Sequence, residues 1–288
     1  TFGTGADKNA ADIALIYGTS TEYYPNIVEL SSANDNALIE DQRHDSNPDN
    51  KIVGRAVTYV EAGSDSAGQT GSPEDPFSTI QTGINAALPG GVVSVAAGVY
   101  PENVIVNKPV EIAGADRSEV KVYPQTSNPL CAEGGSLCDQ ASNVFLVQAN
   151  DVTIHDLSIY GNNPMVTRNV TVNGVDVDAR NGIITDYRAG NFGNLEVYNV
   201  DIRDIYLRGI YQATSGSFSF HDNTVTNVSG DGASIGIFSY GAWGSVEGNI
   251  VDNANDGISA NHSKGIQFLD NQIINSGSGV HSDNASKT

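Results

Sequence analysis

The sequence of 288 residues is poor in several residue types that common folds and polyanion-binding proteins rely on. It has one Met and one Trp, and aromatic residues make up only 7% of it. We therefore expect Val, Ile, Leu and Ala to fill the core. Only 14 Lys and Arg stand against 34 Asp and Glu, for a net charge of −20, which argues against nucleic acid as a partner. No apolar run approaches the roughly 20 residues of a membrane-spanning helix, so no membrane insertion is expected.

Cysteine is also scarce, with Cys131 and Cys138 in the segment CAEGGSLC as the only two. A metal site built on them would need more ligands than their neighbours offer. The six-residue loop between them contains two glycines and can close, so we predict a Cys131–Cys138 disulfide. A disulfide implies an oxidising compartment, and we expect an extracellular or cell-surface protein. The chain shows no signal peptide, so we expect a mature or excised form.

Helix-period segments are missing from the C-terminal half, where two marks recur instead. One mark is an Asn that opens a short β-branched strand, at Asn199, Asn223, Asn249 and Asn271, which are 24, 26 and 22 residues apart. The other is a Gly followed by a β-branched residue, at Gly182, Gly209, Gly236, Gly257 and Gly279. Two marks that keep step at about two dozen residues indicate a solenoid of stacked coils. We expect the glycines at corners that need unusual φ/ψ values, and the asparagines in a hydrogen-bonded ladder.

The short β-branched runs favour strands paired in parallel between successive coils. The sequence thus predicts an all-β fold, a right-handed parallel β-helix, over residues 56–288. Residues 1–55 are interpreted as a partly ordered N-terminal extension or linker. Ile80, Ile84, Ala87 and Leu88 share one helical face, and Ser78 is the expected N-cap, which predicts a short capping helix over the first coil. The C-terminal end of the solenoid is expected to be uncapped.

A succession of short motifs in residues 56–115 carries a resemblance to a known group of proteins. The motifs are Tyr59-Val60, Pro76-Phe77, Thr79-Ile80-Gln81, Val93, Val95, Gly98, Tyr100, Glu102 and Lys108-Pro109. This succession resembles the N-terminal part of secreted bacterial and archaeal β-helix proteins of the pectate-lyase-like superfamily. The resemblance implies the parallel β-helix fold, with function on the outer face of one sheet. It is specific for fold and weak for function, because this fold supports many activities.

Strand alternation places a set of aromatic and polar side chains on that outer face. If the residues after the recurring Gly point inward, the next positions point outward. The predicted substrate-binding residues on this face and its corners are Tyr211, Phe238, Tyr240, Trp243, His262 and His281. Exposed aromatic rings suit stacking on sugars. Packing that merely stabilises the sheet remains the alternative.

Arg residues are concentrated between positions 168 and 208, among several Asp residues. β-Elimination on a uronic acid requires a cation or Arg to neutralise the carboxylate, and a base to remove the C5 proton. The predicted catalytic residues are Arg180, Arg208 and Tyr211, and the predicted ligands of a calcium ion are Asp176, Asp178 and Asp186. Salt bridges between coils are the alternative interpretation of these charges. A hydrolase would instead need two opposed carboxylates.

Two functions remain open at this point. One is an extracellular carbohydrate-active β-helix that binds an acidic polysaccharide, and in one version cleaves it by β-elimination. The other is a non-catalytic surface, sheath or filament protein that self-associates or joins other surface proteins. Its assembly would use the open coil end and the N-terminal segment, which can add a strand to a neighbour.

Overall fold

The structure is a computed structural model. It describes residues 13–16, 27–30, 39–40, 53–65, 68–130, 134–138, 141–168, 170–284 and 286–287. In the N-terminal segment, β1 (Ile13–Ile16) pairs with β2 (Ile27–Leu30) in antiparallel fashion. In the same segment, β3 (Ile39–Glu40) pairs antiparallel with β4 (Val53–Val60), which begins slightly before the expected boundary at residue 55.

Three long sheets form the body of the described chain. Sheet A contains β7 (Val104–Val106), β10 (Asn143–Val147), β15 (Asn181–Thr185), β18 (Arg208–Gln212), β21 (Ile235–Tyr240), β24 (Asp256–Asn261) and β27 (Ser278–Asp283). Sheet B contains β3, β4, β5 (Ala87–Val95), β8 (Val110–Gly114), β11 (Val152–His155), β16 (Leu195–Tyr198), β19 (Ser217–His221), β22 (Trp243–Glu247) and β25 (Ile266–Leu269). Sheet C contains β6 (Gly98–Pro101), β9 (Val120–Tyr123), β12 (Ser158–Tyr160), β17 (Asp201–Ile205), β20 (Thr224–Val228), β23 (Ile250–Ala254) and β26 (Gln272–Ile274).

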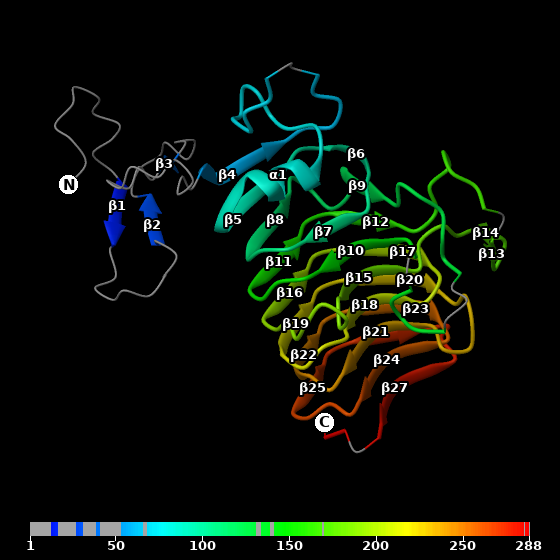
Figure 1. Cartoon of the computed structure of the whole chain (residues 1–288). Helices are drawn as coiled ribbons and strands as arrows, with labels where there is room; N and C mark the ends of the chain where they lie inside the picture. The colour runs from blue at the N-terminus through cyan, green and yellow to red at the C-terminus, as the bar shows by residue number, and fades with distance from the viewer. Residues whose placement is uncertain are drawn as a thin grey trace, which may run out of the picture.

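The chain visits sheets A, B and C in turn and then starts the next coil. From β4 onward, each strand of these sheets pairs in parallel with the equivalent strand of the neighbouring coil. The coils stack one below another from β4 to β27 (Figure 1). This arrangement is a right-handed parallel β-helix, which confirms the predicted fold class. The described part of the chain contains no helix with the length and apolarity of a membrane span.

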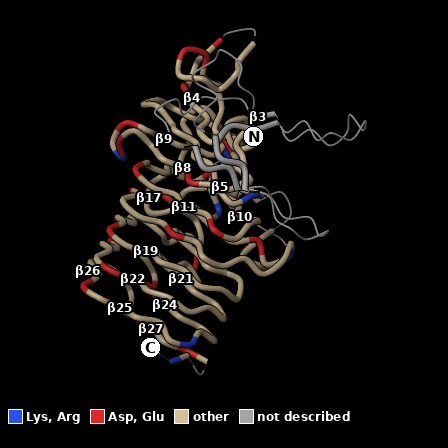
Figure 2. The backbone as a smooth tube through the Cα atoms, turned by 90° about the vertical axis from the view of Figure 1, so that its left-hand side faces the viewer, with Lys and Arg blue, Asp and Glu red and all other residues tan. Residues whose placement is uncertain are grey.

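The core is a column of β-branched residues inside the coils. Ile183, Ile210, Ile237 and Ile258 are in register and almost fully buried. Val280 continues the column in β27 and is 50% exposed. Asp and Glu residues occur along the whole stack of coils, and in the sequence they outnumber Lys and Arg by 34 to 14 (Figure 2).

The recurring glycines form a column, as predicted, but for a different physical reason. Gly209, Gly236 and Gly257 lie inside sheet A strands, and none of them has a positive φ. A Cβ atom on Gly236 would lie 2.6 Å from Val251 Cγ1 and 2.7 Å from Gly257 O. The expectation of unusual φ/ψ values at these positions is wrong. The position requires Gly because the neighbouring coil and the core come too close for a side chain.

The predicted asparagine ladder is present, but one of its predicted members, Asn199, does not belong to it. Asn223 Nδ2 donates to Asn249 Oδ1 over 2.9 Å, and Asn249 Nδ2 donates to Asn271 Oδ1 over 3.0 Å. In the coil before, the equivalent position is Val200, whose backbone N–H donates to Asn223 Oδ1 over 3.0 Å. Asn199 precedes the column by one residue and has a φ of 49°. The left-handed conformation therefore belongs to the residue before the ladder.

The helix α1 (Ile80–Ala86) begins the solenoid and packs against β4, β5 and β7. Ile80 and Ile84 are fully buried, as the helical pattern predicts. The N-cap is Thr79 rather than the expected Ser78, and its side chain accepts a hydrogen bond from the backbone N–H of Thr82. The helix ends before residues 87 and 88, which belong to β5. A short capping helix is thus confirmed, with a shifted start and an earlier end.

Candidate functional site

Two long insertions emerge at one corner of the solenoid. We call the segments that link a sheet C strand to the next sheet A strand the C–A corner. The first insertion, residues 124–142, joins β9 to β10, and the second, residues 161–180, joins β12 to β15. The second contains the antiparallel pair β13 (Thr171–Val172) and β14 (Val175–Asp176). In later coils this corner is short, with only residues 206–207 between β17 and β18.

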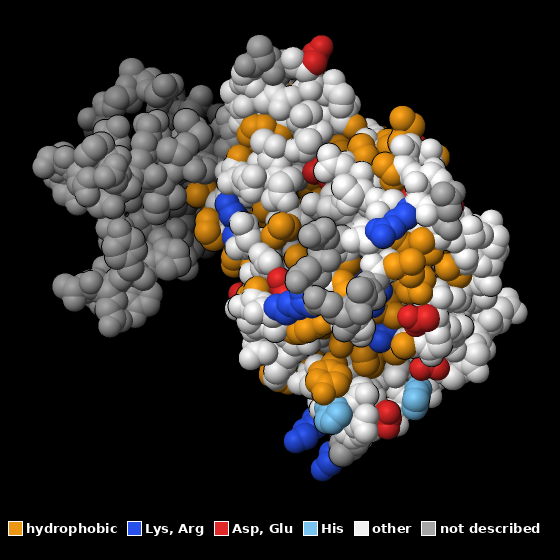
Figure 3. All heavy atoms as spheres, turned by 45° about the vertical axis from the view of Figure 1, so that its right-hand side comes forward, with side chains coloured by type: hydrophobic (Ala, Val, Ile, Leu, Met, Phe, Trp, Pro, Cys, Tyr) orange, Lys and Arg blue, Asp and Glu red, His pale blue; other side chains and the backbone are white. Residues whose placement is uncertain are grey.

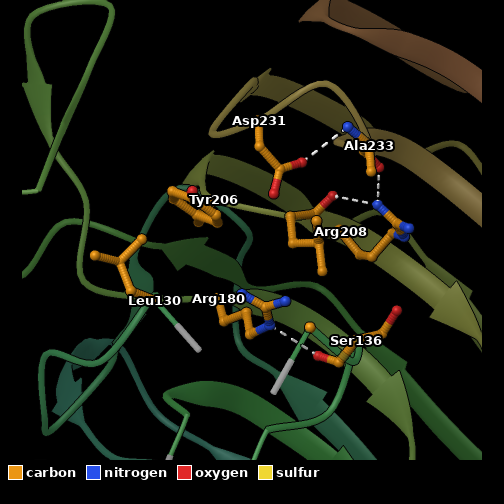
Figure 4. A pocket seen from close by; sticks show the side chains of 9 residues that line it. Leu130, Ser136, Arg180, Tyr206, Arg208, Asp231 and Ala233 are labelled. Carbon is orange, nitrogen blue, oxygen red and sulfur yellow. Dashed lines mark hydrogen bonds between the residues drawn. The ribbon is translucent and has the colours of Figure 1, made fainter. Parts of the chain in front are cut away.

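A pocket of about 180 Å³ lies at this corner. Its lining residues are Leu130, Gly134, Ser136, Arg180, Tyr206, Leu207, Arg208, Asp231 and Ala233. The first three come from the first insertion, Arg208 is the first residue of β18, and the other five come from three successive C–A corners. Arg180, Arg208 and Tyr206 surround the same space, with Asp231 on one side and Leu130 and Ser136 on the other (Figure 4). The structure therefore brings together the two arginines that the sequence predicts as catalytic.

Arg180 holds the first insertion in place. Its side chain is 5% exposed and donates to three backbone carbonyls, Ser136 O at 3.0 Å, Pro129 O at 2.9 Å and Gly135 O at 2.7 Å. Burial lowers the pKa of this guanidinium, whereas the nearby charge of Asp231 raises it. All three nitrogens have partners, so Arg180 builds the pocket wall and supplies positive charge behind it.

Arg208 is the less satisfied of the two arginines. Nη1 donates to Leu207 O over 3.1 Å and to Ala233 O, but Nε is buried without a partner. Within the described residues Arg208 forms no ion pair, and its guanidinium lies 5.0 Å from the ring centre of Phe238. Burial lowers the pKa of Arg208 to about 10, so it stays cationic at neutral pH. A buried cation with unused donors is a ready partner for an anion.

Tyr206 and Asp231 complete the polar lining, and the sequence did not point to either. The Arg180 guanidinium lies 6.0 Å from the ring centre of Tyr206. Burial raises the pKa of Tyr206, and the charge of Asp231 raises it further. Asp231 is exposed, and its Oδ1 accepts from Ala233 N over 2.8 Å. Asp231 could have been predicted as a pocket residue from its position, because it lies shortly before Ile235, which pairs with Arg208 on the neighbouring coil.

The predicted aromatic column is present but covered. Tyr211 and Phe238 are partners in register, and their ring centres are 4.5 Å apart. They are only 6% and 7% exposed because they pack in a second apolar cluster with Leu137 of the first insertion. The expectation that these two rings are exposed is therefore wrong, and packing is what the structure shows for them. Burial also raises the pKa of Tyr211 strongly, so its hydroxyl stays protonated at neutral pH and is not available as a base.

The other predicted binding residues lie away from the pocket. Tyr240 and Trp243 are 43% and 50% exposed. The rings of Tyr240 and His262 are 5.0 Å apart, and His281 Nδ1 lies 3.5 Å from Asp256 Oδ2. None of these four predicted residues lines the pocket. Their assignment to substrate binding stays a prediction.

The three predicted metal ligands do not come together. No group of three or more His, Cys, Asp or Glu side chains suited to a metal exists among the described residues. Asp186 is occupied elsewhere, because Oδ2 accepts from Gln148 Nε2 over 2.8 Å and Oδ1 from Arg188 N over 3.0 Å. The structure does not support Asp186 as a ligand beside Asp176 and Asp178, which lie at the base of the second insertion.

The predicted disulfide lies in the first insertion. Cys138 is buried and disulfide-bonded. Cys131 lies outside the described residues, so its pairing with Cys138 stays a prediction. Next to Cys138, Leu137 N donates to the Tyr187 hydroxyl over 3.0 Å.

The stacked parallel coils and the helix α1 that packs on the first of them form a right-handed parallel β-helix. Pectin methylesterase PemA from Erwinia chrysanthemi is one similar solved structure, with 14% identity and a TM-score of 0.40 over 73% of this chain and 66% of that enzyme. The chain thus spans just under two thirds of that enzyme's length.

Two further solved structures show the same level of similarity. The pectin methylesterase from Aspergillus niger is 12% identical, with a TM-score of 0.45 over 80% of this chain and 85% of its own. An alginate lyase from a Paenibacillus species is 14% identical, with a TM-score of 0.40 over 68% of this chain and 72% of its own. No protein-family profile matches the sequence, and no curated protein matches it.

Proposed function

We propose that this protein binds an acidic polysaccharide and holds the carboxylate of one uronic acid residue against Arg208 in the corner pocket. One observation carries the proposal: Arg208 is a buried guanidinium with an unpartnered Nε and no ion pair in the described structure. An unpaired buried cation is costly for folding, so its retention favours a role in binding. An acidic polysaccharide is also the ligand class named in the sequence-based hypothesis.

The pocket suits a carboxylate on a sugar better than a free small anion. A guanidinium binds a carboxylate through two parallel hydrogen bonds, and low local dielectric strengthens them. Tyr206 and Leu130 add an aromatic and an apolar wall, which a sugar ring can contact. The volume of about 180 Å³ is below the usual range for drug-sized ligands, which favours a single sugar residue in the pocket. On the face shown in Figure 3, Lys and Arg side chains lie among apolar and acidic ones.

A binding experiment tests this proposal. Calorimetric titration with oligogalacturonate and oligoalginate would compare the wild-type protein with Arg208→Met, and with Lys121→Met as a control on sheet C outside the pocket. We expect a loss of affinity of about tenfold or more for Arg208→Met and less than about twofold for the control, because truncating a buried charge contact costs about 2 kcal/mol or more. Equal affinity of Arg208→Met and wild type would overturn the proposal. Equal binding of the methyl-esterified oligosaccharide would overturn it as well.

Cleavage by β-elimination is a second candidate function, supported by the Asp231 carboxylate and the Tyr206 hydroxyl in the same pocket. Asp231 would remove the C5 proton while Arg208 stabilises the charge developing on the carboxylate. The electron pair of the C5–H bond forms the C4–C5 double bond, the C4–O bond breaks, and Tyr206 gives its proton to the departing oxygen. The raised pKa of Tyr206 keeps that proton in place at neutral pH. Asp231 takes the place of Tyr211, which the sequence offered as a candidate base, because Tyr211 is buried.

Ultraviolet absorbance of unsaturated uronate would measure the reaction. We expect Asp231→Asn to abolish product formation while oligouronate binding stays within a few-fold of wild type. If no oligouronate yields product, cleavage is excluded and the binding proposal is judged on titration alone.

A further inference from the structure

The wall that the first insertion gives to the corner pocket is held by side chains around β15. Arg180 Nε and Asn181 Nδ2 both donate to Ser136 O over 3.0 Å. Arg188 Nη2 donates to Leu137 O over 2.5 Å. Movement of this wall away from the pocket would leave the buried Arg180 and Asn181 side chains without these partners, which is costly. The first insertion is therefore a permanent side of the pocket and not a lid.

The opposite wall is the segment that joins β20 to β21, which contributes Asp231 and Ala233. Ser234 Oγ donates to Tyr206 O over 2.7 Å, and Gly230 N donates to the same oxygen over 2.9 Å. A Cβ atom on Gly230 would lie 2.4 Å from Tyr206 Cδ2, so the backbone of this segment packs directly against the ring. Both walls are thus tied to neighbouring coils, and they lie on opposite sides of the pocket (Figure 4).

The outer face of sheet A next to the pocket is covered as well. Tyr211 follows Arg208 by three residues in β18, and Phe238 is its partner in β21. Both rings are buried, and Leu137 of the first insertion packs in one apolar cluster with them. A sugar chain bound at Arg208 therefore meets covered side chains along these strands, and not an open groove.

We propose that the corner pocket takes the terminal residue of an acidic polysaccharide chain and excludes internal residues. An internal residue carries a neighbour on each side of its ring, so it needs a groove that is open at both ends. The pocket of about 180 Å³ has fixed walls on two sides and covered strands on a third. Leu130 lines it and is 44% exposed, so it can contact the next sugar residue as the chain leaves toward solvent. This terminal-residue proposal rests on the proposed function, because it assumes that Arg208 binds the carboxylate.

The number of proteins bound per polysaccharide chain tests the proposal. Calorimetric titration of the full chain would use whichever of galacturonate and alginate binds, as a trimer and as a long polymer of known chain length, with the ligand concentration counted in chains. We expect one wild-type protein per chain for both ligands, and affinities per chain that differ by less than about threefold. Several proteins bound to one long chain would show that internal residues enter the pocket, and would overturn the proposal.

Blocking the two ends of the trimer provides a second measurement. Chemical reduction opens the ring of the reducing-end residue, and a methyl group on O4 blocks the residue at the other end. We expect one of these two changes to weaken binding at least about tenfold, which also identifies the end that enters the pocket. Unchanged affinity after both changes would contradict recognition of a terminal residue.

Arg208→Met separates the terminal-residue proposal from the proposed function. If this variant binds the trimer as tightly as wild type does, the proposed function fails and the terminal-residue proposal fails with it. If binding depends on Arg208 but several proteins occupy one long chain, only the terminal-residue proposal fails. Lys121→Met, whose substitution lies outside the pocket, should behave as wild type in all these titrations.

Discussion

At the scale of single residues, Arg208 shows a conflict between stability and binding. Its charge is buried, its Nε has no partner among the residues that the structure describes, and it stacks on Tyr211 and Phe238. If Arg208 mainly stabilises the fold, its replacement should lower the free energy of unfolding. If Arg208 mainly binds an anion, its replacement should leave the free energy of unfolding unchanged or raise it, because a buried, desolvated charge is removed.

The first prediction follows from that conflict. Arg208→Met should leave the free energy of unfolding unchanged or raise it by up to about 2 kcal/mol, while oligouronate binding is lost. Urea unfolding monitored by circular dichroism measures the first effect. A destabilisation of about 2 kcal/mol or more would identify Arg208 as a packing residue.

Gly236 shows why a small residue recurs in sheet A. A Cβ atom there would lie 2.6 Å from Val251 Cγ1, so Gly236→Ala should destabilise the protein by about 1–3 kcal/mol through overpacking. Gly232 has no atom within 4 Å of a built Cβ and no positive φ, so Gly232→Ala should be neutral or slightly stabilising. Thermal unfolding of the two variants side by side checks this, and equal melting temperatures would contradict the close-approach explanation.

At the scale of elements, the helix α1 depends on a carboxylate from the next coil. Glu102 Oε1 accepts from Ile80 N over 2.8 Å, and Oε2 accepts from Gln81 N over 3.0 Å. These are two of the helix N–H groups that lack a partner within the helix. Burial raises the pKa of Glu102, and the two hydrogen bonds oppose that shift without cancelling it.

The raised pKa gives a pH dependence with a definite sign. The folded protein binds the Glu102 proton more tightly than the unfolded chain, so this residue's contribution to stability falls as the pH rises through the range just above 4.5. Relative to Glu102→Gln, which cannot ionise, the wild-type protein should lose stability as the pH is raised through that range. Unfolding free energies of both proteins at several pH values test this; parallel curves would show that Glu102 does not titrate abnormally.

Sequence reasoning succeeded for elements that repeat and failed where the chain departs from the repeat. The Gly-Ile pairs fall in register because each coil packs against its neighbour and the core in the same way at this position. Asn199 was misplaced by one residue because it looks like a ladder Asn, although Val200 holds that position. The site shows the same division. Arg180, directly before β15, and Arg208, the first residue of β18, were predicted as site residues and line the pocket, whereas Tyr206 and Asp231 lie in corners and were not predicted.

The burial of Tyr211 was unpredictable for a related reason. Strand alternation places its side chain correctly on the outer face of sheet A. Only the path of residues 124–142, which follows no repeat, determines that Leu137 covers it.

At the scale of the whole molecule, the net charge of −20 opposes the approach of a polyanion. The attraction at Arg208 is short-range, but the repulsion from the surface extends over a Debye length, about 30 Å at 0.01 M salt and about 8 Å at 0.15 M. We therefore predict that the association rate of an oligouronate rises by a few-fold between these salt concentrations. Stopped-flow measurements test this, with a methyl-esterified oligomer as a control whose rate stays flat. A falling rate would mean that long-range attraction brings the ligand in.

The regular coils determine the fold of this protein, whereas the insertions at the C–A corner form much of the pocket. The rungs tolerate almost no change, because each glycine and ladder asparagine serves the rung above and the rung below. A corner loop does not have to pack against both neighbouring coils in this way. A loop can therefore be lengthened, exchanged or grafted there while the β-helix stays intact. Replacing residues 124–142 with a foreign loop should yield a protein that still folds but selects a different sugar, which makes this seam the natural place to engineer new recognition.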